Sequence, residues 1–448
     1  MKPVHNEAVP NEAPPPDQRE QAAAVKELRI SVASGIGEVS AADWDACANP
    51  TADSAQRRNA VTPSVQVRRE AEGEAVTAAQ EVAADIDYNP FLSHDFLSAL
   101  EASKSVGSRT GWQPQHVVAR TSDGTVAAVA PCYLKSHSRG EYVFDGGWAE
   151  AYERAGGSYY PKLQVAVPFT PATGRRLLVR AGPLADAVGR AVAGGLVELC
   201  GLVGASGVHV TFATEPEFRL LGGLGYLQRT DQQFHWENQG FTSFDDFLGA
   251  LAARKRKTIR RERHDALANG ITVHWLTGSD LTEEVWDAFF EFYMETGSRK
   301  WGRPYLTRTF YSLVGETMRD RIVLVMAKRA GRWIAGAINF IGSRTLFGRH
   351  WGAIEHHPFL HFELCYYQAI DFAIAHKLPR VEAGAQGEHK ISRGYMPTTT
   401  YSAHYIADPG LRRAIADYLV RERAYVAAAG AELATLAPFR KDFAAEQD

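Results

Sequence analysis

Residues 347–395 read FGRHWGAIEHHPFLHFELCYYQAIDFAIAHKLPRVEAGAQGEHKISRGY, and the predicted fold and site of the chain are organised around this segment. Six of the chain's 15 histidines lie in it, among acidic, basic and aromatic side chains. Charged and imidazole groups are costly to bury unless they are partnered. A dense group of them inside an apolar strand–helix–strand frame therefore predicts a binding or catalytic site.

The segment begins at the end of a predicted strand, 345–354, and continues into a predicted helix, 361–376. Strand alternation places Arg349 and Trp351 on one face and His350 on the other. His361 and Glu363 are two residues apart at the helix start, so they point about 200° apart.

Outside this segment, apolar alternation and turn residues predict an antiparallel meander over 321–328, 333–341 and 345–354. The first half alternates predicted strands with helices, and its Gly- and Tyr-rich region 141–160 is typical of a loop that lines a cleft. The predicted fold class is α/β (α+β), with a mixed, mainly antiparallel sheet flanked by helices in each half. This pattern indicates a fold duplication without sequence repetition.

A basic run separates the two halves. Ser243 is the predicted N-cap of a helix that ends at the Asn269-Gly270 pair. Residues 254–263 carry seven positive charges and one negative charge, which attract phosphate. A solvated charged face is the alternative interpretation. The predicted phosphate-binding residues are Arg254, Lys255, Lys257, Arg260 and Arg261.

Composition restricts the class of protein. The chain has 448 residues, 45% of them hydrophobic, and a net charge of -3, so contact with a polyanion has to be local. Its four cysteines form no CxxC pair, which argues against a disulfide framework or a structural zinc site. The N-terminus lacks an apolar signal region, and no run of about 18 apolar residues predicts a membrane span. These features predict a soluble cytoplasmic protein without membrane insertion.

Composition shifts predict the domain limits. A disordered Pro-rich tail, 1–27, is followed by a first domain, 28–237, which has a mobile insertion at about 50–87. The basic helical segment, 238–270, connects this domain to a second domain, 271–425. The chain ends in a helical C-terminal tail, 426–448.

The chain resembles the FemAB-like N-acyltransferases of the GCN5-related acyltransferase superfamily, in the bacterial branch labelled peptidoglycan biosynthesis or recognition. The resemblance extends from Asn89 to about Ala424. It is carried by the basic helix after Phe247-Leu248, the GRHWG strand end, LHFELCYYQAI and EAGAQGEHKISRGY.

The resemblance implies two tandem acyltransferase-like domains and transfer of an acyl or aminoacyl group to an amine. It implies acyl-CoA or aminoacyl-tRNA as co-substrate with no tightly bound cofactor, a small-molecule or cell-wall precursor as acceptor, and tRNA as a partner. The CoA loop of the superfamily, Gln/Arg-x-x-Gly-x-Gly/Ala, is only approximated by 170–176 and 382–387, so the donor stays open.

Acyl transfer to an amine needs a proton acceptor, donors for the oxyanion and an acid for the leaving group. Glu382 ends a strand before Gly384 and is placed to point into a cleft. By resemblance, Lys390 contacts the acyl donor or the transition state; a surface lysine in a turn is the alternative. The predicted catalytic residues are Lys390, Glu382, His389 and Glu363. The predicted substrate-binding residues are Arg349, His350, Trp351, His361, Tyr366, Gln386, Glu388, Arg393 and Tyr395.

Two other functions compete with acyl transfer. One is a non-catalytic protein with the same fold that recognises cell-wall or nucleotide ligands. The other is a metal-dependent hydrolase, since His356, His357, His361 and Glu363 are close in sequence. A His-Pro turn breaks the helical spacing of these four residues and there is no HExxH, so no metal is predicted.

Overall fold

The computed structural model describes residues 28–50, 86–301, 304–384 and 387–440. The predicted tail 1–27, nearly all of the predicted insertion, Gln386 and the last residues of the predicted C-terminal tail lie outside the described residues.

Two sheets form the protein. The small sheet has the order β1-β3-β4-β7, and the large one has 11 strands in the order β10-β11-β12-β13-β14-β9-β15-β8-β6-β5-β2. The strands of the small sheet are β1 (Arg29–Ala33), β3 (His116–Arg120), β4 (Val126–Ala130) and β7 (Leu178–Val179). The strands of the large sheet are β2 (Trp112–Pro114), β5 (Cys132–Lys135), β6 (Lys162–Val165), β8 (Gly207–Ala213), β9 (Leu227–Glu237), β10 (Ile271–Leu276), β11 (Ile322–Arg329), β12 (Arg332–Ile341), β13 (Thr345–Ala353), β14 (Arg380–Glu382) and β15 (Met396–Ile406).

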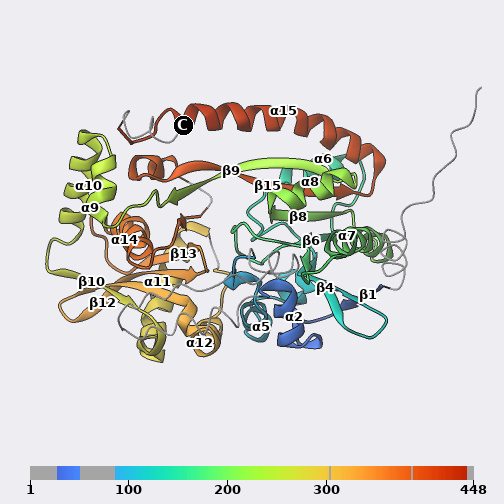
Figure 1. Ribbon diagram of the computed structural model, residues 1–448, viewed down its shortest axis with the longest axis horizontal. Helices are drawn as coiled ribbons and strands as arrows, with labels where there is room; N and C mark the ends of the chain where they lie inside the picture. Colours follow the sequence, from blue (N-terminus) through green and yellow to red (C-terminus); the bar gives the residue numbers. More distant parts are fainter. Residues whose placement is uncertain (1–27, 51–85, 302–303, 385–386, 441–448) are drawn as a thin grey trace, which may run out of the picture.

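Helices cover both parts of the large sheet, and the longest, α15, runs along β9 and β15 (Figure 1). The helices are α2 (Ala41–Ala48), α5 (His94–Ala102), α6 (Gly146–Arg154), α7 (Ala185–Leu202), α8 (Glu215–Gly223), α9 (Phe244–Ala250), α10 (Ala253–Ala266), α11 (Glu283–Trp301), α12 (Arg308–Thr317), α13 (Leu360–Phe362), α14 (Gln368–Ala375) and α15 (Pro409–Ala434). The predicted α/β class with mixed, mainly antiparallel sheets is confirmed. No helix within the described ranges is long and apolar enough to cross a membrane.

Strand pairing crosses the predicted limit at residue 237. The late strand β15 pairs with β8 on one side and with β9 on the other, both antiparallel. In turn, β9 pairs with β14 of the second half. One continuous sheet therefore joins the two halves and holds their loops in a fixed relation.

The predicted single basic helix is wrong in one respect, because α9 and α10 are separate helices. Ser243 caps α9 as predicted, its side chain accepting from the Asp246 amide. Leu251 is extended, with ψ 152, and its side chain is fully buried. The Ala252 amide donates to the Pro438 carbonyl at 2.9 Å, so a contact from the far end of the chain breaks the helix.

The predicted helix 361–376 is continuous, but its second turn, Glu363–Tyr367, is a π-helix between α13 and α14. Such π turns are frequent at functional sites. As their spacing predicts, His361 and Glu363 point to different environments. Glu363 is fully buried, whereas His361 lines a cavity.

Candidate active site

A cavity of about 810 Å³ is lined by both halves of the chain. From the first half come His137, Arg139, Tyr142 and Tyr160, and from the second half Tyr293, Tyr305, Arg349, His350, Trp351 and His361. We call it the large cavity. Tyr142 and Tyr160 come from the region predicted to line a cleft; that region also contains α6, which the sequence did not predict.

A bulge in β13 brings three predicted substrate-binding residues to the large cavity. Ile338 of β12 pairs with His350, but the next residue, Asn339, pairs with Gly348, so Arg349 is the extra residue. A bulge breaks strand alternation at the inserted residue. The prediction that His350 faces away from Arg349 and Trp351 is therefore wrong, and all three line the cavity.

Burial lowers the pKa values of two side chains that line the large cavity. The Arg349 guanidinium donates to the Phe169 carbonyl, and burial lowers the pKa of Arg349 below its ordinary value. The His350 ring lies 5.1 Å from the Tyr293 ring, and burial lowers the pKa of His350 to about 3. His350 is thus a neutral imidazole at physiological pH.

A second cavity of about 560 Å³ meets the large one. We call it the small cavity, and it is lined by residues around the turn before α13, including Glu355, Phe359 and Leu360. Thr296, Trp351 and His361 line both cavities. The Trp351 and His361 rings are 5.2 Å apart, so these two side chains stand at the junction. Molecules in the two cavities would therefore approach the same imidazole.

His137, which the sequence reasoning missed, is held in one tautomer. Its Nδ1 accepts from the Arg139 amide at 3.2 Å, and its Nε2 therefore donates to the Thr110 carbonyl at 3.0 Å. A ring with both nitrogens engaged in this way has no lone pair for a substrate proton. His137 is a wall residue, and the imidazole at the junction is that of His361.

Lys390 lies behind the wall of the large cavity. It is 2% exposed, and its ammonium donates to the Gly384 carbonyl at 2.9 Å, while Gly384 itself lines the cavity. Burial lowers the pKa of Lys390 to about 8. The neighbouring His389 is exposed and pairs with the Tyr366 hydroxyl at 3.0 Å. Neither side chain is among the lining residues of the two cavities.

Glu382 is among the lining residues of a third cavity, of about 610 Å³, and not of the two that meet at His361. It is 5% exposed, and its Oε2 has no hydrogen-bond partner among the described residues. Burial raises the pKa of Glu382 to about 7. Glu382 does not line the large cavity with Arg349, His350, Trp351 and His361, although it is close enough to Arg349 for the two charges to interact.

The raised pKa of Glu382 predicts a stability change with pH. In the folded protein Glu382 keeps its proton up to about pH 7, whereas in the unfolded chain it loses the proton near its ordinary pKa of 4.5. The free energy of unfolding therefore falls as the pH rises from about 4.5 to about 7. Glu382→Gln should therefore raise the free energy of unfolding over wild type by about 2–3 kcal/mol more at pH 8 than at pH 5. Urea denaturation at both pH values measures this difference, and an equal effect at both would contradict it.

Glu363, Arg393, Tyr366 and Tyr395 are engaged in packing. Glu363 accepts from Arg263 of α10 at 2.9 Å and from Gln368 at 2.7 Å. Arg393 donates to Glu262 of α10 at 2.8 Å. The Tyr395 hydroxyl donates to the Tyr366 carbonyl at 3.1 Å. These contacts hold α10 and the 388–393 turn in place. We therefore assign Glu363 and Arg393 to positioning these elements and not to a catalytic step. Glu388 is exposed.

Several basic side chains of α10 have a polar partner within the protein. Lys255 donates to Ser392 at 3.0 Å, Arg260 pairs with Asp245 at 3.2 Å and Arg261 pairs with Asp265 at 3.3 Å. Arg254 and Lys257 are exposed. Because α10 packs against α13 and the 388–393 turn, this basic surface lies beside the elements that carry His361 and Lys390.

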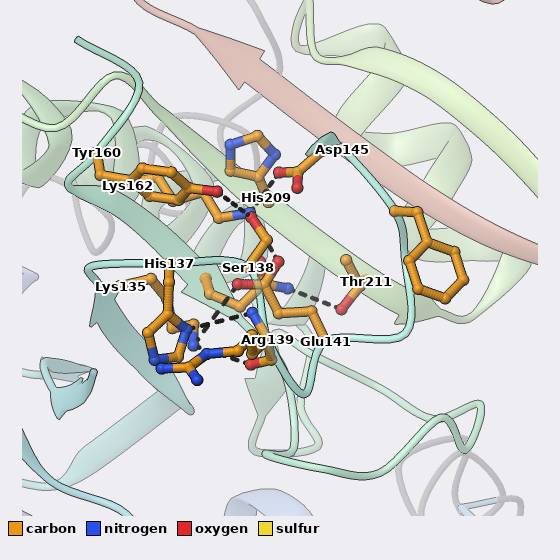
Figure 2. A network of polar contacts seen from close by, with 12 residues as sticks. Lys135, His137, Ser138, Arg139, Glu141, Asp145, Tyr160, Lys162, His209 and Thr211 are labelled. Carbon is orange, nitrogen blue, oxygen red and sulfur yellow. Dashed lines mark hydrogen bonds and ion pairs between the residues drawn. The ribbon is translucent and has the colours of Figure 1, made fainter. Parts of the chain in front are cut away.

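A buried ionic network in the first half, absent from the sequence predictions, anchors the other wall of the large cavity (Figure 2). Lys162 of β6 is fully buried and donates to Glu141 at 2.6 Å and to Asp145. Lys135 lies 3.7 Å from Glu141, and burial lowers its pKa to about 7. Glu141 and Asp145 belong to the segment whose residues 137–140 line the cavity. The sequence feature that could have predicted this network is a lysine in each of two short strands, 132–135 and 162–165.

The metal alternative finds no ligand set in the structure. Within the described ranges, no group of three or more His, Cys, Asp or Glu side chains is arranged to hold a metal ion. His357 pairs with Glu355 at 2.9 Å, and Glu363 is taken by Arg263.

Comparison with known proteins places the chain in a family. The model of the FemAB-like family, described as peptidoglycan biosynthesis/recognition, matches residues 35–441. Curated proteins give no significant match. Similar solved structures include FemX (12% identity, 76% of this chain and 99% of that chain, TM-score 0.48) and L-PGS from Bacillus licheniformis (10%, 75% and 98%, 0.46). Another is a tandem GNAT protein from the clavulanic acid biosynthesis pathway (14%, 86% and 99%, 0.41). Because the family model matches most of its length, this chain belongs to the FemAB-like family and is an acyltransferase.

Proposed function

We propose that this acyltransferase moves an acyl or aminoacyl group from a phosphate-bearing donor to the amine of a cell-wall precursor. The reaction takes place where the large and small cavities meet. The observation that carries the proposal is that His361, Trp351 and Thr296 line both cavities. Two substrates held on either side of one imidazole have their reacting atoms brought together, which removes much of the entropic barrier to a bimolecular step.

The donor occupies the small cavity. That cavity is lined by α13, and α10 packs against α13. A donor whose acyl end enters beside His361 can therefore lay its phosphates along the exposed Arg254 and Lys257. Phosphate contacts of this kind position a nucleotide or RNA without reading its sequence. Both acyl-CoA and aminoacyl-tRNA carry such phosphates.

The acceptor occupies the large cavity. Two arginines, Arg139 and Arg349, line it, and its described lining contains no carboxylate. A positive cavity attracts an anionic acceptor. The rings of Trp351, Tyr142 and Tyr305 add apolar faces on which sugar or peptide groups pack. These features suit a charged cell-wall precursor and agree with the description of the family.

The residues at the junction supply the chemistry. His361 takes a proton from the acceptor nitrogen as that nitrogen attacks the donor carbonyl carbon. Arg349 and the neutral His350 are placed in the acceptor cavity to stabilise negative charge on the carbonyl oxygen. The bond to the donor's sulfur or ester oxygen then breaks, and the leaving group takes the proton from His361. The products are an amide and a free thiol or hydroxyl.

Binding without catalysis is the competing proposal. It requires only one ligand site, whereas two cavities that share an imidazole favour transfer between two molecules. Incubation of the protein with each donor class and an amine-bearing precursor, followed by mass spectrometry, separates the two. An amide product supports transfer, and intact substrates with both donor classes contradict it.

The charge of α10 gives a prediction for the donor. The double substitution Arg254→Glu/Lys257→Glu should raise the dissociation constant for aminoacyl-tRNA about tenfold or more at low salt, because phosphate contacts are lost. Both side chains are exposed, so the free energy of unfolding should change by less than about 0.5 kcal/mol. Fluorescence anisotropy at two salt concentrations measures the effect.

The matched control is Arg413→Glu/Arg421→Glu, which makes the same charge change at exposed positions of α15. Equal weakening by both pairs would show a non-specific effect of net charge and contradict the role of α10. Loss of tRNA binding with unchanged acyl-CoA binding would identify aminoacyl-tRNA as the donor.

A further inference from the structure

An aromatic ring that lines the small cavity is also exposed to solvent. The side chain of Phe359 is 38% exposed, and it lines this cavity together with His361 and the exposed His356. Phe359 and His361 are two residues apart, so their Cα atoms lie within about 7 Å of each other. A group that packs on the Phe359 ring is therefore close to the imidazole at the junction.

The backbone holds Phe359 in an unusual conformation. Its φ is 61 and its ψ is -2, in the left-handed region that bulky side chains rarely adopt. The Phe359 carbonyl accepts from the Glu363 amide at 2.9 Å, and the Leu360 amide donates to the His357 carbonyl at 3.4 Å. Residues held in such conformations cluster at ligand-binding sites. These bonds fix the position of the ring before any ligand arrives.

Phe359 is the exposed member of a group of packed rings. Its ring centroid lies 6.2 Å from that of Phe362, with an angle of 36° between the planes. The Phe362 ring is stacked on the Tyr366 ring at 6.0 Å, and the Arg393 guanidinium lies 3.6 Å from the Phe362 centroid. Because Phe362 is already covered by these neighbours, a further flat ring has Phe359 as its stacking surface.

Positive charge lies next to this group of rings. Glu363, whose amide binds the Phe359 carbonyl, accepts from Arg263 of α10 at 2.9 Å. The basic helix α10 therefore packs directly against the turn that carries Phe359. Arg254 and Lys257 are exposed on the same helix.

The negative charge of the small cavity is already neutralised. Within the described lining, Glu355 is the one carboxylate. Its Oε2 accepts from Arg329 at 2.8 Å and pairs with His357 at 2.9 Å, and its Oε1 accepts from Arg332 at 3.3 Å. An exposed aromatic ring beside cations is the arrangement by which proteins bind the bases and phosphates of single-stranded nucleic acid.

We propose that Phe359 binds the nucleobase of the acyl donor by stacking. This assignment rests on the proposed function, in which the donor occupies the small cavity, and it adds the residue that selects a donor carrying a base. The base lies on the exposed Phe359 ring, the phosphates along Arg254 and Lys257, and the acyl group beside His361. Adenine is the base in both donor classes, because CoA contains adenosine and the 3′ end of tRNA is an adenosine.

The experiment measures binding of adenosine 5′-monophosphate (AMP) to the full chain by isothermal titration calorimetry. Ribose 5-phosphate is the matched probe, since it has the phosphate and lacks the base. AMP should bind at least about tenfold more tightly than ribose 5-phosphate, the usual effect of stacking one base on an aromatic ring. Phe359→Asn removes the ring and keeps a residue that tolerates left-handed backbone, so it should weaken AMP binding by about tenfold.

Two further variants separate stacking from a structural role. Phe359→Trp keeps an aromatic face and should bind AMP at least as tightly as wild type. Tyr425→Asn removes a ring of α15 that is 74% exposed, and it should leave the dissociation constant for AMP within about twofold of wild type.

Three results would overturn the assignment: AMP binding no tighter than that of ribose 5-phosphate, unchanged AMP binding in Phe359→Asn, or equal losses in Phe359→Trp and Phe359→Asn. Titration of the same variants with CoA and with puromycin, which carries an aminoacyl group on adenosine, identifies the source of the base. The donor class is the one whose binding Phe359→Asn weakens, and weakening of neither contradicts the assignment. None of these titrations needs acyl transfer, so failure of the transfer assay is a separate result.

Discussion

His361→Ala should lower kcat for amide formation by about 10²–10⁴-fold, the usual contribution of a general base. The reason is the position of the imidazole, which lines both substrate cavities and is the ring to which the attacking nitrogen can pass its proton. The KM of each substrate should change far less, because the walls formed by Trp351 and Arg349 remain. Initial rates with each substrate varied in turn give both constants.

A remote histidine supplies the control. His274 of β10 is exposed and packs beside Trp333, so His274→Ala should leave kcat within about twofold of wild type. A His361→Ala variant that keeps wild-type kcat while remaining folded would contradict the assignment of the base. A uniform rise in KM with unchanged kcat would contradict it too, because that pattern marks a group used only for binding.

Lys162→Met should lower the free energy of unfolding by about 3–5 kcal/mol, the usual effect of removing one partner of a buried ion pair. Lys162 is fully buried, and it is the cation that Glu141 and Asp145 share (Figure 2). Without it, two carboxylates remain in a site with little water. Guanidinium denaturation followed by circular dichroism measures the loss.

Two further variants check the cause of this loss. Arg190→Met removes the cation of an exposed pair with Asp186 and should cost less than about 1 kcal/mol. Adding Asp145→Asn to Lys162→Met should recover part of the stability, because one of the stranded charges is then removed. Equal losses for Lys162→Met and Arg190→Met would show that the buried network does not hold the wall of the large cavity.

Local patterns predicted much of the second half of the fold. The meander became β11, β12 and β13, and the apolar face of the predicted helix became α14 with its π turn. The sequence predicts four neighbouring substrate-binding residues that the structure brings to one cavity, namely Arg349, His350, Trp351 and His361. They share a short stretch of chain, so local reasoning could group them.

Contacts between distant parts of the chain could not be predicted in the same way. The bulge at Arg349 depends on the register of β12 against β13, and strand alternation gave the wrong face for His350. Glu363 is a predicted catalytic residue, but its partner Arg263 lies 100 residues away in the sequence. Lys135 and Lys162 lie in short apolar strands, and their carboxylate partners became visible only in the folded protein.

We propose that the two cavities meeting at His361 hold two different substrates. The most direct measurement is the KM of donor and acceptor for amide formation in two blocked variants. Ile354→Trp fills the small cavity and Ser138→Trp the large one, since each residue lines only one of them. We predict that Ile354→Trp raises the KM of the donor alone and Ser138→Trp that of the acceptor alone. If both variants raise the KM of the same substrate, the two cavities do not hold different substrates.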